Sequence, residues 1–277
     1  MARAVTLRNW VFLALPRAPV APPPAIELDS RTNKAVGPAR NAMRRITVSI
    51  VIPVYNEKRW LKELVRRVEA TAIDSIDKEL ILVDDGSTDG THEVLREMEQ
   101  RGHRVLYQPA NRGKGAALRL GFQQARGDII LVQDADLEYD PADYPTLLRP
   151  LLDGTADVVY GSRFLGTHGR QARHVVHYLA NRLITLFSNI FTGLQLTDME
   201  TCYKAFRRQT LDGVALTSDR FGFEPEVTAK IAARKPRWRI REVPIGYTGR
   251  SYEDGKKIRF RDALQALYCV VRFGLFE

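Results

Sequence analysis

Three carboxylates follow a hydrophobic run in the middle of the chain. Asp134, Asp136 and Glu138 follow the run Ile129-Ile130-Leu131-Val132, from which Gln133 separates them. Residues i, i+2 and i+4 of an extended segment point to the same side, so we expect these three side chains to converge on one cation. Hard oxygen ligands suit Mg²⁺ or Mn²⁺, which proteins hold with one or two carboxylates and substrate phosphates. The spacing predicts a divalent metal site; the alternative is a polar strand end that leads into a turn.

Polar clusters also follow the other predicted strands of the first half. They are Tyr55-Asn56-Glu57, Asp84-Asp85 and Asn111-Arg112-Gly113-Lys114. Ligands of an open parallel sheet gather beyond the carboxyl ends of its strands. We therefore expect these clusters and the Asp134 cluster to meet at one edge.

The elements that must position these clusters alternate along the chain. Short apolar runs and amphipathic stretches follow one another, which indicates βαβ units, a parallel sheet and an α/β fold. The expected strands are Thr47–Pro53, Leu80–Val83, Val105–Gln108, Asp128–Asp134, Asp157–Gly161 and Trp238–Pro244. The expected helices include a stretch around Trp60–Val68, one that begins near Asp89, and Gly113–Ala125, His177–Phe191, Glu224–Arg234 and Phe260–Leu275.

The composition is that of a soluble globular protein with a basic, proline-rich N-terminal tail. The chain has 277 residues, of which 44% are hydrophobic and 27% charged, and its formal net charge is +9. Residues 1–45 hold eight Lys/Arg, two Asp/Glu and six prolines, so six of the nine net charges lie there. We expect residues 1–45 to be a disordered tail and residues 46–277 to be one catalytic domain. We also expect that translation begins at Met43 and that the start at Met1 is too early. Because the rest of the chain is nearly neutral, a nucleic-acid groove is not expected.

The two cysteines, Cys202 and Cys269, are far apart and lack metal-ligand spacing. A reducing cytoplasm fits this usage better than a disulfide framework. No stretch reaches the ~18 apolar residues that indicate a membrane span. The last predicted helix has an apolar face and a basic start, so it either packs on the domain or lies on an anionic membrane. We expect a cytoplasmic protein with peripheral contact to the inner face of the cytoplasmic membrane.

The motifs as a set resemble those of the inverting glycosyltransferases of family 2, which have the GT-A fold. The resemblance rests on Val51–Glu57, Val83–Thr91 and Asn111–Gly115, and later segments resemble the branch that includes dolichol-phosphate mannosyltransferases, dolichyl-phosphate glucosyltransferases and their soluble bacterial relatives. Those later segments are Gln133–Glu138, Gly161–Phe164 and Glu242–Ile245. The resemblance implies a Rossmann-like, mainly parallel sheet with flanking helices and a role in cell envelope glycan biosynthesis.

The resemblance also implies roles for single residues. Asp134-Ala135-Asp136 would be the DxD motif, Glu138 the third metal ligand, and Val83 a nucleotide contact. Arg163 would contact the donor or acceptor phosphate, and Arg182 the acceptor phosphate. Arg250 and Lys256 match basic residues of a loop that closes over the diphosphate.

The residues themselves suggest how a nucleotide sugar would be held. A metal at Asp136 and Glu138, with Asp134 near it, would neutralise the departing diphosphate, and Lys or Arg side chains would share that task. The resemblance implies that Asp136, Arg163, Arg250 and Lys256 are the catalytic residues. Pro53, Tyr55 and Glu57 could wall the base and ribose, and Asp85 could bind a base edge. Lys114 lacks the G-x-x-x-x-G-K-[ST] frame of a P-loop, so it is a candidate phosphate or uracil contact only.

Each assignment has a structural alternative. Glu57 could stabilise a helix N-terminus through the macrodipole, and Asp84-Asp85 could form an Asx-turn and cap. Arg182 could be a surface helix residue, and Arg250 a solvated loop charge.

We expect transfer of a hexose from a nucleotide-diphosphate sugar to a polyprenyl phosphate, dolichyl or undecaprenyl. The acceptor oxygen is then already anionic, so no strong general base is needed. If the acceptor is instead a hydroxyl of a soluble molecule or glycan, a carboxylate base is required. The candidates for it are Asp198, Glu200, Glu224 and Glu226. The alternative outside the enzymes is a binding module without catalytic activity, which would bind a sugar nucleotide or a nucleic acid.

Overall fold

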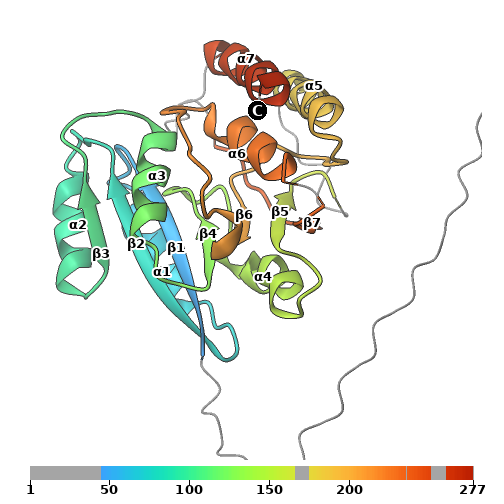
Figure 1. Cartoon of the computed structure of the whole chain (residues 1–277). Helices are drawn as coiled ribbons and strands as arrows, with labels where there is room; N and C mark the ends of the chain where they lie inside the picture. The colour runs from blue at the N-terminus through green and yellow to red at the C-terminus, as the bar shows by residue number, and fades with distance from the viewer. Residues whose placement is uncertain (1–44, 166–174, 235, 251–259, 277) are drawn as a thin grey trace, which may run out of the picture. The chain divides into compact units, whose positions relative to one another are not determined.

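A computed structural model describes residues 45–165, 175–234, 236–250 and 260–276. Residues 45–277 form one compact unit, and its described parts are a seven-stranded sheet with helices around it (Figure 1). The predicted tail lies, except for Arg45, outside the described residues and stays a prediction.

The sheet is mainly parallel, as predicted. Its strands are β1 (Ile46–Val54), β2 (Ile76–Asp84), β3 (Arg104–Tyr107), β4 (Ile129–Val132), β5 (Val158–Ser162), β6 (Lys204–Arg207) and β7 (Ile240–Pro244). They lie in the order β3-β2-β1-β4-β6-β5-β7. All neighbours run parallel except β6, which is antiparallel to both β4 and β5.

The register of the central strands brings their carboxyl ends to one edge. Val54 of β1 pairs with Asp84 of β2, and Val51 of β1 pairs with Val132 of β4. The middle of each strand is completely buried, which explains why these strands read as continuous apolar runs. The segments that follow β1, β2 and β4 therefore start side by side.

Helices follow most strands. They are α1 (Leu61–Ala70), α2 (Thr91–Gln100), α3 (Lys114–Gln124), α4 (Tyr144–Leu152), α5 (Val175–Thr192), α6 (Phe223–Ala232) and α7 (Phe260–Phe276), with 3₁₀ turns at Pro141–Asp143 and Arg208–Thr210. Helix α3 lies directly on β1 and β2 (Figure 1). Gly121 permits this approach, because a Cβ atom there would come within 2.3 Å of the Val51 side chain.

Three elements differ from the expectation. Helix α4 and strand β6 were not expected, and the predicted strand Asp128–Asp134 is shorter, since β4 ends at Val132. Beside the β6–β5–β7 part of the sheet, α5, α6 and α7 pack on one another (Figure 1). Within the described residues, no helix has the length and apolar character needed to span a membrane.

Candidate active site

The three carboxylates after β4 do not converge on one point. The backbone bends from Ala135 to Tyr139, so the same-side rule for extended segments does not apply beyond Val132. Asp134 pairs with Lys114, whereas Asp136 and Glu138 face Arg250. In the part of the chain that the structure describes, no group of three acidic, histidine or cysteine side chains is arranged to hold a metal ion. In this conformation Asp134 has a different partner from the other two carboxylates, and the metal site predicted at Asp134, Asp136 and Glu138 stays a prediction.

A guanidinium group lies among three carboxylates at this edge. Arg250 Nη2 is 2.6 Å from Asp136 Oδ2, Nη1 is 3.2 Å from Glu57 Oε2, and Nε is 3.5 Å from Glu138 Oε1. We call Glu57, Asp136 and Glu138 the acidic cluster. The Arg250 side chain is only 13% exposed, which contradicts the alternative of a solvated loop charge.

The acidic cluster carries more negative charge than Arg250 balances. Burial, followed by the charges of Asp134 and Glu138, raises the pKa of Asp136 to about 7 despite the nearby arginine. A site with three partly buried carboxylates and one guanidinium thus favours additional positive charge.

The segment that carries Arg250 is fastened to Glu138. The backbone N–H of Arg250 donates to Glu138 Oε1 at 2.8 Å, and Tyr247 Oη donates to Oε2 at 2.9 Å. The backbone N–H of Thr248 donates to the Glu138 carbonyl oxygen. Sequence reasoning missed Tyr247, whose only signal was a lone aromatic residue three positions before Arg250.

Lys114 lies at the start of α3 and bridges two carboxylates. Its Nζ is 2.9 Å from Asp134 Oδ1 and 3.1 Å from Glu224 Oε1. Burial alone would lower the pKa of Lys114, but the charges of Asp134 and Glu224 outweigh it and raise the pKa well above the ordinary value. Lys114 is therefore a permanent cation beside Asp134.

Asp85 fastens the loop that leads into α3. Its two oxygens accept hydrogen bonds from the backbone N–H groups of Arg112 and Gly113, both at 2.7 Å, and from the side chains of Gln108 and Asn111. A carboxylate has about four lone-pair sites, so these bonds use its ordinary capacity. This role differs from the Asx-turn and cap considered for Asp84-Asp85, since it is Asp84 that accepts from the Ser87 backbone N–H; contact of Asp85 with a base edge stays a prediction.

The remaining nucleotide candidates lie where β1, β2 and β4 end. Pro53 and Tyr55 are half-buried, whereas Val83 and Ala135 are buried. Glu57 lies at the start of α1, and its nucleotide role stays a prediction. Its carbonyl oxygen accepts the backbone N–H groups of Trp60 and Leu61 at the start of α1, while its carboxylate faces Arg250.

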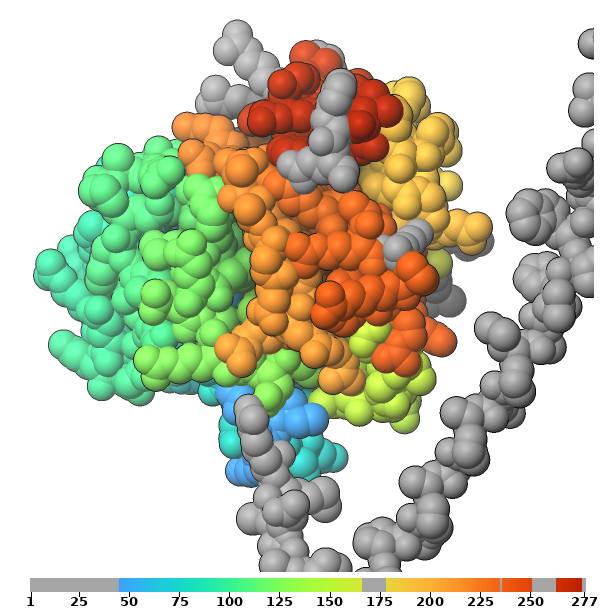
Figure 2. Space-filling view, in the orientation of Figure 1, coloured from blue at the N-terminus to red at the C-terminus, as the bar shows by residue number. Residues whose placement is uncertain are grey.

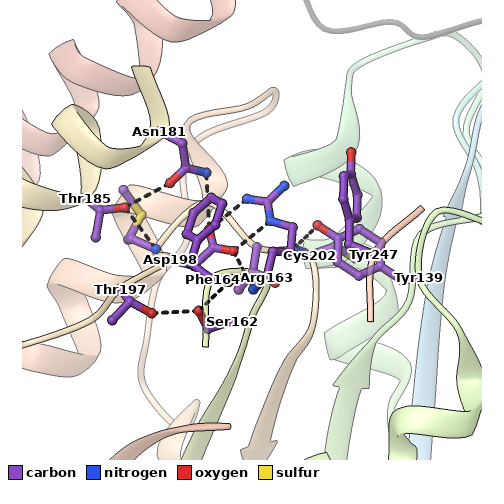
Figure 3. Close-up of polar contacts among 12 residues, drawn as sticks. Tyr139, Ser162, Arg163, Phe164, Asn181, Thr185, Thr197, Asp198, Cys202 and Tyr247 are labelled. Carbon is purple, nitrogen blue, oxygen red and sulfur yellow. Dashed lines mark hydrogen bonds and ion pairs between the residues drawn. The ribbon is translucent and has the colours of Figure 1, made fainter. Parts of the chain in front are cut away.

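A second polar group surrounds Arg163 (Figure 3). Arg163 Nε and Nη2 each donate to an oxygen of Asp198 at 2.7 Å, and Asn181 of α5 also donates to Asp198. These partners lower the pKa of Asp198 although burial opposes them. The Arg163 guanidinium also lies over the Tyr247 ring, 5.2 Å from its centroid, which links this group to the Arg250 segment.

Arg182 and Lys256 are the other two basic residues that were predicted to contact phosphate. Arg182 is exposed, and its Nη1 is 3.5 Å from the carbonyl oxygen of Thr197. Its role as a phosphate contact stays a prediction, with the surface alternative open. Lys256 lies outside the described residues.

Three of the four candidate bases have committed partners. Asp198 is paired with Arg163, Glu224 with Lys114, and Glu226 with Lys230. The fourth, Glu200, has a buried Oε1 without a hydrogen-bond partner, as Glu224 has at its Oε2. Burial, followed by the charge of Glu224, raises its pKa to about 8.

A buried lysine was not predicted. Lys204 of β6 is fully buried, its Nζ donates to the Thr201 carbonyl oxygen, and burial lowers its pKa against the attraction of Glu224 and Glu200. Its only sequence signal was its position between Tyr203 and Ala205-Phe206 in an otherwise apolar stretch.

Comparison with known proteins gives a family match and several relatives. The family described as Glycosyl transferase family 2 matches residues 49–214. An undecaprenyl-phosphate 4-deoxy-4-formamido-L-arabinose transferase of Pseudomonas fluorescens is 33% identical over 218 residues, which are 76% of this chain and 59% of the relative. The transferase of the same name from Salmonella choleraesuis is 35% identical over 216 residues, 76% of this chain and 62% of the relative. The chain thus spans about three fifths of the length of these relatives.

Solved structures of similar shape support the fold. Glucosyl-3-phosphoglycerate synthase of Mycobacterium tuberculosis, in a complex with Mn²⁺, uridine diphosphate and phosphoglyceric acid, superposes with a TM-score of 0.63 at 22% identity and covers 84% of this chain and 80% of that one. Its complex with uridine diphosphate gives a TM-score of 0.64 at 23% identity, with coverages of 83% and 80%. The likeness confirms the predicted α/β architecture.

Proposed function

The chain belongs to glycosyl transferase family 2, and from that premise we propose that it transfers a sugar from a nucleotide-diphosphate donor to a polyprenyl phosphate. Membership confirms the family predicted from the motifs. The similar transferases carry undecaprenyl phosphate in their names, which supports the acceptor. Their named sugar is an arabinose, a pentose, so the hexose of the sequence prediction rests on the motif resemblance alone.

One observation carries the proposal: a buried acidic cluster and two arginines lie at the edge where the central strands end. The edge lies where an open parallel sheet binds its ligand. Arg250 reaches Glu57 and Asp136 there, and Tyr247 links this segment to Arg163. Such an arrangement can hold a diphosphate and a phosphate close together, which is the main task of catalysis when both reactants are anions.

A divalent cation fits the acidic cluster by its chemistry. The donors are hard carboxylate oxygens, and the charge of Glu57, Asp136 and Glu138 exceeds that of Arg250. We propose that Asp136 and Glu138 bind Mg²⁺ or Mn²⁺ next to the donor, with Asp134 held by Lys114 behind them. When bound, the ion would supply positive charge to the departing diphosphate.

The residues of this chain would then assist the transfer in defined ways. An anionic oxygen of the acceptor phosphate attacks the anomeric carbon, the bond from that carbon to the diphosphate oxygen breaks, and the configuration inverts. Arg250 and Lys256 would stabilise the leaving diphosphate, and Arg163 and Arg182 would orient the acceptor phosphate. No proton has to be removed, in keeping with the engagement of Asp198, Glu224 and Glu226 by cations.

A hydroxyl acceptor is the second candidate, and Glu200 is the observation that favours it. A group with a pKa of about 8 and an unpartnered buried oxygen is suited to accept a proton near neutral pH. Product analysis separates the two: a mild-acid-labile, chloroform-soluble product supports the polyprenyl phosphate acceptor.

The central test is Asp136→Asn, assayed with UDP-glucose, GDP-mannose and related donors, a short polyprenyl phosphate, and Mg²⁺ or Mn²⁺. We expect turnover to fall by about two orders of magnitude, because the metal and Arg250 both lose their charged partner. The melting temperature should change little, because burial and the charges of Asp134 and Glu138 already disfavour the ionised form of Asp136 in the folded protein. Glu93→Gln, an exposed carboxylate on α2, is the control and should keep full turnover. Wild-type turnover by Asp136→Asn would refute the metal assignment.

A further inference from the structure

Glu242 of β7 is a half-buried residue whose carboxylate binds one turn of the chain. Its Oε1 accepts the backbone N–H groups of Thr197 and Asp198 at 2.9 and 2.8 Å. Its Oε2 accepts the same Thr197 N–H at 2.8 Å and the Thr197 hydroxyl at 3.0 Å. One carboxylate thus binds three donors of two successive residues.

The turn belongs to a segment that cannot hold itself in place. Residues 193–203 connect α5 with β6 and contain neither helix nor strand, so their buried N–H groups need partners other than a regular ladder. Four consecutive N–H groups donate to side chains: those of Leu196 and Met199 to α5, and the two between them to Glu242. Glu242 therefore ties the turn to the sheet, while α5 holds it on either side.

Strand β7 gives this carboxylate a firm support. It pairs in parallel with β5, where Glu242 lies opposite Tyr160 and the register continues to Ser162. Strand β7 also packs on α4, and the two adjoin in the space-filling view (Figure 2). Because Arg163 directly follows Ser162, Glu242 and Arg163 start from neighbouring strands.

Asp198 transmits the position of the turn to Arg163. Its carboxylate accepts Arg163 Nε and Nη2 at 2.7 Å each and the Arg163 backbone N–H at 3.1 Å (Figure 3). Such a two-point pair fixes the plane of a guanidinium group. Asp198 is completely buried, and its own backbone N–H is one of those that Glu242 binds. A shift of this backbone would therefore turn the guanidinium group.

A chain of hydroxyl groups joins the same turn to both neighbours of Arg163. Thr197 Oγ1 donates its single proton to Glu242, so Ser162 Oγ, which lies 2.6 Å from it, must donate to Thr197 (Figure 3). Ser162 Oγ in turn accepts the backbone N–H of Phe164 at 3.1 Å. The residues before and after Arg163 thus belong to one hydrogen-bond chain that ends on Glu242.

The position of Glu242 requires a group with two acceptor atoms, because both of its oxygens face donors. Burial raises the pKa of Glu242, and the hydrogen bonds from Thr197 and Asp198 oppose this effect. A glutamine has nearly the same shape, but its NH₂ group would face a donor and leave that donor unpaired. Glu242→Gln therefore changes the hold on the turn with little loss of packing.

We propose that Glu242 is a positioning residue for Arg163: by holding the backbone of Thr197 and Asp198, it keeps the Arg163 guanidinium turned towards the acceptor phosphate. Asp198 binds Nε and Nη2 and leaves the two N–H groups of Nη1 for another anion. Glu242 acts through Asp198 and need not reach the substrate itself. The inference rests on the proposed function, which places the acceptor phosphate at Arg163.

The test compares the KM values for donor and for a short polyprenyl phosphate in variants of the full chain. Glu242→Gln should raise KM for the acceptor about tenfold, because a displaced Arg163 makes a weaker charged hydrogen bond. KM for the donor should change less than about twofold. Glu79→Gln is the matched control, since Glu79 of β2 also accepts a hydroxyl and a backbone N–H, from Ser49 and Arg126. Both KM values should stay at wild type in it.

Arg163→Lys as a background separates positioning from a general loss of structure. If Glu242 acts through Arg163, Glu242→Gln should change KM for the acceptor less than about twofold once Arg163 is replaced. An effect of about tenfold that persists in that background would overturn the inference, because the two residues would then act independently. A wild-type KM for the acceptor in Glu242→Gln would overturn it as well.

Thr197→Val is the milder variant that decides the question if Glu242→Gln does not fold. It removes the hydroxyl links to Glu242 and Ser162 and leaves the backbone links in place. We expect KM for the acceptor to rise about threefold, since one hydrogen bond of the chain is lost at each end. An unchanged KM in Thr197→Val would contradict the inference.

A signal from Arg163 itself separates this inference from the proposed function. In protein made with isotope-labelled arginine, the Nε–H resonance of Arg163 is identified by its absence in Arg163→Lys. It should shift in Glu242→Gln and stay in place in Glu79→Gln. A shift in a protein that transfers no sugar to polyprenyl phosphate would sustain the positioning and remove the acceptor. An unmoved resonance would overturn the positioning whatever the acceptor is.

Discussion

At the scale of single residues, the site is governed by competition for negative charge. Arg250 occupies the position among Glu57, Asp136 and Glu138 that any other cation would need. Lys114 meanwhile neutralises Asp134 from the other side. A metal ion bound at the acidic cluster would therefore share its ligands with Arg250, and a donor diphosphate would give Arg250 an alternative partner.

This sharing predicts opposite effects of Arg250→Ala on metal binding and on turnover. Without donor, the variant should bind Mn²⁺ about tenfold more tightly, because the acidic cluster loses its internal cation. Turnover should fall about a hundredfold, because the leaving diphosphate loses a positive contact. Mn²⁺ affinity is measured by calorimetry or electron paramagnetic resonance, and turnover by donor hydrolysis and transfer.

Arg241→Ala serves as the control, since Arg241 is an exposed arginine of β7. Neither quantity should change in it. Unaltered Mn²⁺ affinity and turnover in Arg250→Ala would place Arg250 outside the site.

At the scale of elements, sequence patterns predicted what depends on local periodicity. The buried runs of β1, β2 and β4 and the spacing of Leu61, Leu64, Val65 and Val68 in α1 agree with the expected elements. Because parallel strands end at the same edge, the gathering of polar clusters there was also predictable.

Elements that depend on tertiary contacts could not be predicted in this way. Helix α4 contains Pro150 and begins with Tyr144-Pro145, which reads as a break rather than a helix. Strand β6 is four residues long and starts with the buried Lys204, so its sequence looks like a loop. Partners far along the chain, such as Glu224 for Lys114 and Arg250 for Asp136, leave no local pattern at all.

Helix α3 makes a close backbone contact at Gly115, which gives a prediction about the packing of this helix. A Cβ atom at Gly115 would lie 2.2 Å from the Ser218 carbonyl oxygen, in the segment that leads to α6. That segment also receives the Ala116 backbone N–H at the Asp219 carbonyl oxygen. Gly115→Ala should therefore cost about 1–3 kcal/mol of unfolding free energy despite the better helix propensity of alanine. Chemical denaturation measures this loss of unfolding free energy.

Gly102→Ala is the comparison that separates packing from backbone strain. Gly102 has a φ of +90° and nothing near its Cβ position, so only strain contributes there, at about 1–2 kcal/mol. Because Lys114 and Glu224 lie on the two elements that this contact joins, Gly115→Ala should also reduce turnover, whereas Gly102→Ala should not. Unchanged stability in Gly115→Ala would mean that residues 218–220 can move away from the added Cβ atom without a loss of unfolding free energy.

At the scale of the whole molecule, the compact unit combines a rigid sheet with an interior that holds ionisable groups. Lys114, Asp134, Glu200, Lys204 and Glu224 lie between α3, β6 and α6, and their charges interact through the buried region. The surface of the same unit carries exposed apolar side chains at α5 and α7. Global stability should consequently depend on pH through the buried groups, independently of the surface.

Glu200 gives this dependence a sign. Its ordinary pKa is 4.5, and in the folded protein burial and Glu224 raise the pKa to about 8. Between these values the folded chain keeps a proton that the unfolded chain has lost, so the stability from neutral Glu200 is present below pH 4.5 and is lost as the pH rises towards 8. The loss amounts to at most about 1.4 kcal/mol per pH unit.

Glu200→Gln, which stays neutral in both states, should unfold in urea with a free energy that falls less steeply between pH 4.5 and pH 8. Glu93→Gln, at an exposed position, should keep the wild-type slope. Identical slopes for Glu200→Gln and wild type would mean that Glu200 is ionised in the folded protein, and its candidacy as a proton acceptor near neutral pH would end with that result.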